Sequence, residues 1–267
     1  MADGLEPILR IGLHNRVRLG SFWDRLDLPG SYWRLYWMQG EGAALSGRDG
    51  KQRPLRPDHL YLLAPNCNLT GHCTGTPVQY YLHFELAGVA GNPAFPLHEI
   101  PLTEVSCSLL TEWLESIDRG WQDTAPGILR GMALAVYALG RLPENALLAR
   151  PPDRRIEKVC ALMRGNPARD WTLAELAQEA GLTANYFLRH FQSVTGVPPG
   201  RYLRRLRYDN AARMLSDGTL SIDQICQEIG VKDRFHFSRE FKRYFGEPPA
   251  QYRKHFRAVS GEKSQEK

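Results

Sequence analysis

Thr172-Leu-Ala-Glu-Leu-Ala-Gln-Glu-Ala-Gly-Leu182 is followed later in the chain by Ser221-Ile-Asp-Gln-Ile-Cys-Gln-Glu-Ile-Gly-Val231. The two segments match position by position, and their glycines, Gly181 and Gly230, are 49 residues apart (230 − 181). Beyond the glycines one residue has been added, so that later matching positions are 50 residues apart, as in 237 − 187. Two copies are too few for a solenoid, so the repeat indicates a duplicated helical motif.

Each copy has the pattern of two short helices joined by a glycine turn. Thr172 with Glu175 three positions later is a capping box that begins a helix, and Ser221 is a good N-cap for the first helix of the second copy. Gly181 is expected in a left-handed turn, followed by a helix from Ala184 to Val194 that buries two phenylalanines. One such pair could be an ordinary helical hairpin. Two copies with matching basic residues favour helix-turn-helix motifs, whose second helix enters the DNA major groove.

Residues 154–257 resemble the DNA-binding domain of the AraC/XylS family of bacterial transcription regulators. The resemblance is carried by Leu176, Ala177, Gly181, Tyr186, Phe187, Arg189, Phe191, Gly196, Pro198, Tyr202, Arg207 and residues 211–215, and then by Ile222, Ile225, Gly230, Asp233, residues 237–242, Gly246, Pro248, Tyr252 and Arg253. Val231 departs from the pattern, since the family usually has Phe there. Phe235-His236 departs from it as well, because a small residue and Tyr are usual. The resemblance implies an all-α domain with two helix-turn-helix motifs that binds promoter DNA.

Charge is divided unevenly along the chain. Residues 1–150 hold 13 Lys and Arg against 15 Asp and Glu, whereas residues 151–267 hold 21 against 14, a net of +7. Phosphate binding needs this excess in the duplicated half. The five scattered cysteines fit a reducing compartment without a disulfide framework. No apolar run spans a bilayer and no signal peptide is recognisable, so we expect a cytoplasmic protein with no membrane partner.

The outward positions early in each second helix are the expected base contacts, because they face away from the buried phenylalanines. They are Asn185, Leu188 and Arg189 in the first copy, and Arg234, Phe235, Ser238 and Arg239 in the second. Asn suits adenine, Arg suits guanine and Leu suits a thymine methyl. Either matching arginine could instead bind phosphate or another part of the domain. The expected phosphate contacts, which position the protein without specifying sequence, are Thr183, Arg204, Arg205, Lys242 and Arg243. Arg201 and Arg207, on the same helix as Arg204 and Arg205, are also expected to point outward.

Short strands and turns dominate residues 22–86, with strands expected at 32–38, 59–63 and 78–86 and a hairpin turn at 47–50. Residues 1–20 show no clear period and are expected to form an arm. The order of strands is similar to the cupin-like sensor barrel of AraC-type regulators. Alternation places Gln79, Tyr81 and His83 on one face. With Arg34 and Tyr36 on another aromatic strand, these residues are the candidate effector site, suited to a small hydrophilic ligand such as a sugar. Solvent exposure or packing against helices is the alternative.

Residues 105–117 and 126–142 predict two helices, which the resemblance implies pack on the barrel and mediate homodimerisation; packing within the domain alone is the alternative. A linker is expected at 143–153, the first helix of the DNA-binding domain at 154–164, a long connecting helix at 200–215, and a disordered tail at 258–267. The predicted architecture is therefore a two-domain α+β protein. It has a cupin-like sensor and dimerisation domain at 1–142 and an all-α DNA-binding domain at 154–257.

Phosphate loops, nucleophile elbows and zinc-protease motifs are absent from the sequence, so an enzyme is not expected. Cys67, His72, Cys73 and His83 do not have standard zinc spacing, and no metal or other cofactor is predicted. The predicted function is a ligand-responsive transcription regulator, with activation or repression left open. The alternatives are a constitutive DNA binder without an effector, and a cupin metalloenzyme fused to a DNA-binding domain.

Overall fold

The computed structural model describes residues 8–28, 32–47, 49–65, 67–92, 95–121, 123–149 and 153–254. These residues form two compact units: Ala149 belongs to a β-rich unit and Asp153 to a helical one. The coarse expectation of a two-domain α+β protein is thereby confirmed. Among the helices within the described ranges, none has the length and hydrophobicity required to cross a membrane. The predicted tail, 258–267, lies outside the described residues.

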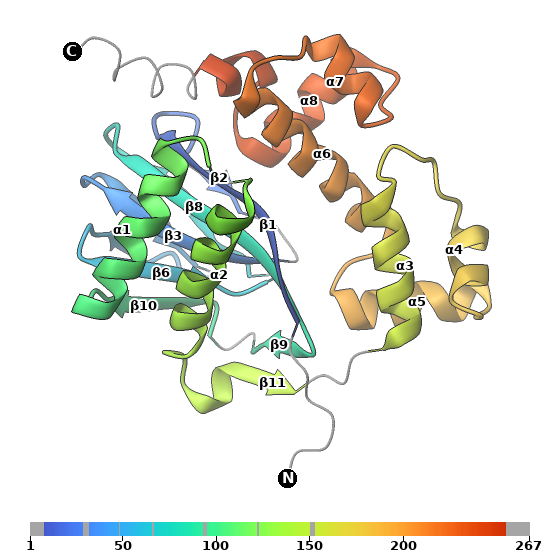
Figure 1. Ribbon diagram of the computed structural model, residues 1–267, viewed down its shortest axis with the longest axis horizontal. Coiled ribbons are helices and arrows are strands. Elements are labelled where there is room, and N and C mark those ends of the chain that lie inside the picture. The colour runs from blue at the N-terminus through green and yellow to red at the C-terminus, as the bar shows by residue number, and fades with distance from the viewer. Residues whose placement is uncertain are drawn as a thin grey trace. The chain divides into compact units, whose positions relative to one another are not determined.

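The β-rich unit is built on an antiparallel sheet with strand order β1-β8-β3-β6-β10. The strands are β1 (Ile8–Arg18), β3 (Trp33–Gln39), β6 (His59–Leu63), β8 (Val78–Ala87) and β10 (Leu97–Pro101). Helices α1 (Glu104–Asp118) and α2 (Ala125–Leu139) lie over one face of this sheet (Figure 1). Trp33, Leu82 and Trp113 are buried in the core between the sheet and these helices.

A second sheet covers the other face. Its strand order is β2-β7-β4-β5, formed by β2 (Leu26–Asp27), β7 (Thr70–Cys73), β4 (Ala43–Ser46) and β5 (Gln52–Leu55). Met38 and Tyr61 point away from the helices and are nevertheless fully buried. The Tyr61 hydroxyl donates to the Pro54 carbonyl of β5 at 3.3 Å, which ties the two sheets together. The turn between β4 and β5 is the expected one, closed by the Gly50 amide on the Gly47 carbonyl.

The expectation of an arm at residues 1–20 is wrong for Ile8–Arg18, which form the long edge strand β1. The register of β1 on β8 shifts between Ile11 and Leu13, as in a β-bulge. Such a bulge reverses which residues face the helices. Polar His14 and Arg16 therefore lie on the helix side, where Arg16 pairs with Asp118 and the Trp113 indole donates to the His14 ring at 3.3 Å. Because polar residues occupy these inward positions, the sequence lacks the apolar alternation that would have predicted the strand.

Part of the predicted linker also belongs to the β-rich unit. A 3-10 turn, η1 (Glu144–Ala146), leads into β11 (Leu147–Ala149), which pairs antiparallel with β9 (Val89–Gly91). Ala146 is buried, and Leu147 packs against the core beneath α1 and α2. Because β11 pairs with β9, residues 143–149 belong to the β-rich unit and are not part of a linker.

The helical unit contains α3 (Arg154–Gly165), α4 (Leu173–Glu179), α5 (Ala184–Thr195), α6 (Pro199–Asp217), α7 (Ile222–Glu228) and α8 (Arg234–Phe245). Phe187 and Phe191 of α5 pack with α3, α4 and the start of α6 in one core. Phe237 of α8 stacks on Tyr208 of α6, with ring centroids 5.9 Å apart. The long helix α6 therefore contributes to the packing of both helix pairs, α4/α5 and α7/α8 (Figure 1).

Candidate nucleic-acid interface

The first helix pair forms as its local sequence dictates. The Thr172 side chain accepts from the Glu175 amide, and Glu175 reciprocates at the backbone of Thr172. Gly181 has φ +64°, which allows the chain to turn between α4 and α5. Phe187 and Phe191 are fully buried, so the opposite side of α5 is presented outward. The predicted base contacts on that side, Asn185, Leu188 and Arg189, are all exposed.

The second pair repeats this arrangement with different chemistry. Ser221 and Gln224 form the capping box of α7, and Asp233 caps α8 by accepting from the amides of the next helical turn. Of the predicted base contacts, Phe235 is 86% exposed, Arg234 and Arg239 are exposed, and Ser238 is half-buried. Arg234 forms an ion pair with Asp223 at 3.1 Å.

Four of the five predicted phosphate contacts lie on the surface. Thr183 is exposed, and its hydroxyl makes no capping hydrogen bond. Lys242 is exposed as well. Arg204 and Arg243 share the carboxylate of Glu240, at 3.5 and 3.2 Å, while their own side chains remain 49% and 65% exposed. These four side chains can contact DNA phosphates without any rearrangement of the helices that carry them.

Two arginines expected to point outward from α6 do not. Arg205 is buried, pairs with Asp209 at 3.4 Å and lies over the ring of Tyr202. Arg207 donates to the carbonyls of Pro167 and Ala168 at 2.7 and 3.1 Å. Because α6 has packed neighbours on several sides, its cationic residues do not share a single outer face.

The same loop that Arg207 binds also contacts the second helix pair. A Cβ added to Gly230, between α7 and α8, would lie 2.1 Å from the Ala168 carbonyl oxygen. Backbone of the second pair therefore packs directly on the loop that precedes α4. With α6 running between the pairs, these contacts hold α5 and α8 at a fixed separation.

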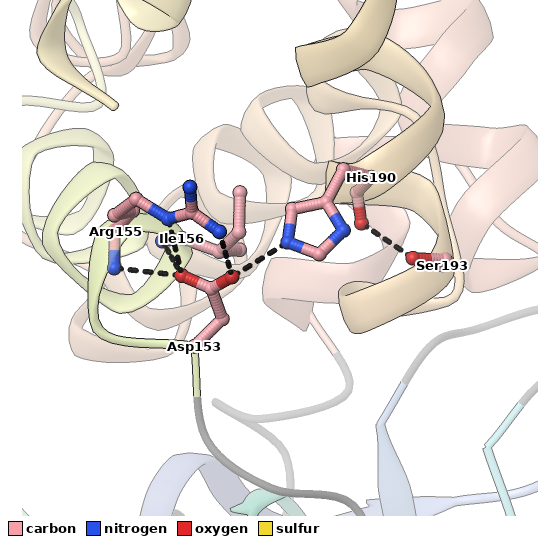
Figure 2. Close-up of polar contacts among 5 residues, drawn as sticks. All are labelled: Asp153, Arg155, Ile156, His190 and Ser193. Atoms are coloured by element: carbon pink, nitrogen blue, oxygen red, sulfur yellow. Dashed lines mark hydrogen bonds and ion pairs between the residues drawn. The ribbon is translucent and has the colours of Figure 1, made fainter. Parts of the chain in front are cut away.

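A partly buried contact also links α3 to α5, as Figure 2 shows. The carboxylate of Asp153 caps α3 by accepting from the amides of Arg155 and Ile156, and it receives the Arg155 guanidinium at 2.9 Å. His190 of α5 contacts the same carboxylate, with its Nε2 atom 2.6 Å from Oδ2. Hydrogen bonds from Arg155 and then His190 hold the pKa of Asp153 far below its usual range. The sequence offered no signal for this pairing, because the two residues are distant in the chain.

The candidate effector residues lie together on the face of the first sheet that points away from α1 and α2. Arg34 of β3 is opposite His83 of β8, and Tyr36 is opposite Tyr81. Arg34, Tyr36, Gln79 and Tyr81 are buried, so the alternative of solvent exposure does not hold for these four; His83 is half-buried.

The surroundings of Arg34 are aromatic. Its guanidinium lies 4.6 Å from the centroid of the Tyr32 ring, whose own centroid is 4.6 Å from that of His83. Burial acts to lower the pKa of Arg34, but the nearby phenols and the Cys67 thiol raise it on balance. Burial raises the pKa of Tyr36. The sequence missed Tyr32 as a member of this cluster.

Cys67, His72, Cys73 and His83 are the residues of the alternative metal site, and two of them, His72 and Cys73, make other contacts. The His72 ring is 2.7 Å from the Ser46 hydroxyl, and the Cys73 thiol donates to the Gly75 carbonyl. Within the described ranges, no group of three or more His, Cys, Asp or Glu is arranged to hold a metal ion.

Comparisons with known proteins agree with this geometry. Residues 176–255 match the family model of a helix-turn-helix domain. An uncharacterized HTH-type transcriptional regulator of Haemophilus influenzae is 29% identical over 179 residues, which cover 65% of this chain and 55% of that protein. A putative AraC-like transcription regulator of Streptomyces lividans is 34% identical over 108 residues, covering 40% of this chain and 36% of that protein. The matched part of the chain thus spans about half the length of the first relative and less of the second.

Among solved structures, the chain is similar to unsaturated fatty acid bound wild-type ToxT from Vibrio cholerae strain SCE256. The TM-score is 0.60 at 13% identity, and the match covers 96% of this chain and 98% of ToxT. At this level of identity the similarity concerns the fold, which includes both the β-rich and the helical unit.

Proposed function

We propose that this chain is an AraC-like transcription regulator and that both of its helix pairs are helix-turn-helix motifs that read one DNA site; the helix-turn-helix family match and the AraC-like relatives support this. In this proposal α5 and α8 enter successive major-groove segments, about 34 Å apart along the duplex. Asn185, Leu188 and Arg189 face the bases of one segment, and Phe235, Ser238 and Arg239 those of the other. Arg234 can join them if its ion pair with Asp223 opens.

The observation that carries the proposal is the matching exposure of the two second helices. Phe187 and Phe237, at equivalent positions, anchor α5 and α8 in the core, while Arg189 and Arg239, also equivalent, lie exposed on the outside. Arginine donates two hydrogen bonds to the major-groove edge of guanine, and each such pair is worth ~1–3 kcal/mol of discrimination. The four exposed phosphate candidates supply the contacts that position the protein.

Arg189→Ala tests this function. Full-length protein is first used to select a binding sequence from a random duplex pool. We expect the variant to bind the selected duplex roughly 5- to 150-fold more weakly at constant salt, as loss of ~1–3 kcal/mol requires. Arg53→Ala removes an exposed arginine from the β-rich unit and serves as the control. Unchanged binding by Arg189→Ala would exclude a base contact by this residue.

The inner face of the first sheet is the proposed effector site, in a β-rich unit that we take to be a cupin-like barrel. The cross-strand grouping of Arg34, Tyr36, Tyr81 and His83 supports it, and Gln79 lies on the same face two residues before Tyr81. Phenol, amide and imidazole groups suit a ligand rich in hydroxyls, such as a sugar, and the guanidinium also suits a carboxylate. ToxT, which shares the fold, has been solved with an unsaturated fatty acid bound.

A thermal-shift screen of sugars and carboxylic acids separates these effectors, since a ligand that binds the native state raises the melting temperature. The raise should be smaller in Tyr36→Phe, which removes one hydroxyl from the site. A screen without any shift would favour the constitutive DNA binder.

Homodimerisation through α1 and α2 is also proposed. Val105, Leu129 and Val136 are apolar yet about 60% exposed on these helices, which favours a protein contact over solvent. Sedimentation equilibrium of the wild type and of Leu129→Lys tests it, with loss of the dimer expected in the variant.

A further inference from the structure

We infer that Phe235 is a specificity residue that reads the 5-methyl group of a thymine in the DNA segment facing α8. The inference rests on the proposed function and adds a ligand chemistry to one position of it.

The exposure of Phe235 has no structural purpose within the helical unit. It is 86% exposed in the first turn of α8, whereas Phe237 and Phe241 of the same helix are fully buried. Keeping a phenyl ring in water forgoes roughly 25 cal/mol for each Å² of apolar surface that burial would remove. The phenyl ring therefore adds little to the packing of the domain and lies on its surface.

The backbone that carries the ring is nevertheless held by hydrogen bonds. The Asp233 carboxylate accepts from the Phe235 amide at 2.8 Å and from the His236 amide at 3.2 Å, which holds the first turn of α8. Phenylalanine has only two side-chain torsions, so ordering it against a partner costs little conformational entropy. Arg234, the residue before Phe235, is paired with the Asp223 carboxylate of α7.

The position of Phe235 on α8 determines which part of the DNA its ring would contact. Ser238 and Arg239 follow Phe235 by three and four residues, so the three side chains lie along one stripe. A stripe that places Arg239 at base edges also places Phe235 there. Among the groups displayed in the major groove, the thymine 5-methyl is the apolar one, while the others are hydrogen-bond donors and acceptors. A phenyl ring therefore distinguishes thymine from the other bases by this methyl group.

The duplication provides an internal comparison. The position of α5 equivalent to Phe235 is Asn185, and its neighbour Leu188, 36% exposed, is equivalent to Ser238. The first of these two positions is polar in α5 and apolar in α8, and the second is apolar in α5 and polar in α8. We expect the thymine read by α8 to lie opposite the first turn of its helix, whereas Leu188 contacts its own thymine one turn further along α5.

The test uses full-length protein and the duplex selected from a random pool. Each thymine of the segment facing α8 is replaced in turn by deoxyuridine, which removes only the methyl group. One replacement should weaken binding of the wild type about fourfold, which corresponds to ~0.8 kcal/mol for one buried methyl-sized group. Phe235→Ala should bind the thymine duplex more weakly and should not distinguish deoxyuridine at that position.

Two further variants separate the methyl contact from general effects. Phe235→Leu retains an apolar side chain and should keep the sensitivity to deoxyuridine. Leu188→Ala should keep it also, because that residue faces the other segment. At the same position, 5-methylcytosine paired with guanine should bind more tightly than cytosine paired with guanine.

The outcomes distinguish this inference from the function on which it rests. If no duplex is selected from the pool, the proposed DNA-reading function fails. If a duplex is selected but no thymine is sensitive to deoxyuridine, or if Phe235→Ala retains the sensitivity, the assignment of Phe235 is overturned while the function stands. Binding unaffected by Phe235→Ala would instead identify the ring as a protein-contact residue.

Discussion

Gly181 and Gly230 occupy equivalent positions between the helices of the two pairs, with φ +64° and +69°. Both need the left-handed conformation that favours glycine. Their surroundings differ, however. A Cβ at Gly181 would meet no atom within 4 Å, whereas one at Gly230 would lie 2.1 Å from the Ala168 carbonyl oxygen. Gly181 is thus required only by its left-handed backbone conformation, whereas Gly230 is also required by the close approach of the loop at Ala168.

Alanine substitutions should separate these two requirements. Gly181→Ala should cost about 1–2 kcal/mol, the strain of a left-handed alanine. Gly230→Ala should cost about 1–3 kcal/mol more, because a backbone carbonyl has to move. Thermal unfolding of the full chain, followed by circular dichroism, measures both. Equal losses would show that the Ala168 contact yields without cost.

Residues whose role is set by neighbours in sequence were the ones that could be predicted. The capping box at Thr172 and the N-cap at Ser221 follow from local sequence, and both are present; Ser221 also forms a capping box with Gln224. Arg204 and Arg205 are adjacent, yet one is exposed and the other buried against Asp209. Nothing local distinguishes them, because α6 has packing partners on several sides.

Hydrophobic periodicity predicted the helices and strands that keep one apolar face along their whole length. It failed for β1, in which the residues that face the core change partway along the strand. β8 forms where alternation was expected, β6 forms where a short apolar strand was expected, and α1 and α2 follow the helical stripes. β1 was missed because the register shift after Ile11 exchanges its two faces, and His14 and Arg16 then occupy buried positions beside α1. The candidate effector face could be deduced from the alternation of β8, but its pairing with Arg34 and Tyr36 depends on strand order.

Asp153 couples two helices, since it caps α3 and receives His190 from α5. Asp153→Ala should cost about 1–2 kcal/mol near neutral pH through loss of the cap, and more through loss of the histidine contact. Asp153→Asn keeps a capping oxygen and should cost less. Asp233→Ala, which removes the equivalent cap of α8, is the matched control.

The stability contributed by Asp153 also depends on pH. Its folded-state pKa is depressed, so the contribution is complete above the unfolded value of about 3.9 and is lost as pH falls toward the folded value. The difference in melting temperature between wild type and Asp153→Ala should therefore shrink below about pH 4. A difference that stays constant on acidification would contradict the charged contacts assigned to this carboxylate.

Across the whole molecule, the two halves of the chain differ in net charge. The segment 151–267 has a net charge of +7 (21 basic against 14 acidic residues), and the preceding segment has −2 (13 against 15). Attraction to DNA therefore falls to the helical unit, and its affinity should be stated at a given salt concentration. The sequence set the boundary between the units a few residues too early, because the pairing of β11 with β9 is not visible in local composition.

The fixed separation of α5 and α8 makes a prediction about the DNA site as a whole. α6 packs with both pairs, Arg207 binds the loop before α4, and Gly230 packs on the same loop. An insertion of about 5 base pairs between the two segments turns one to the opposite side of the duplex, and about 10 restore the side but lengthen the distance. Fluorescence anisotropy should show that both insertions weaken binding of full-length protein to the level of Arg239→Ala or below, whereas a flexible connection would let the longer insertion recover affinity. Such a recovery would mean that α6 and its contacts do not hold the two reading helices in one register.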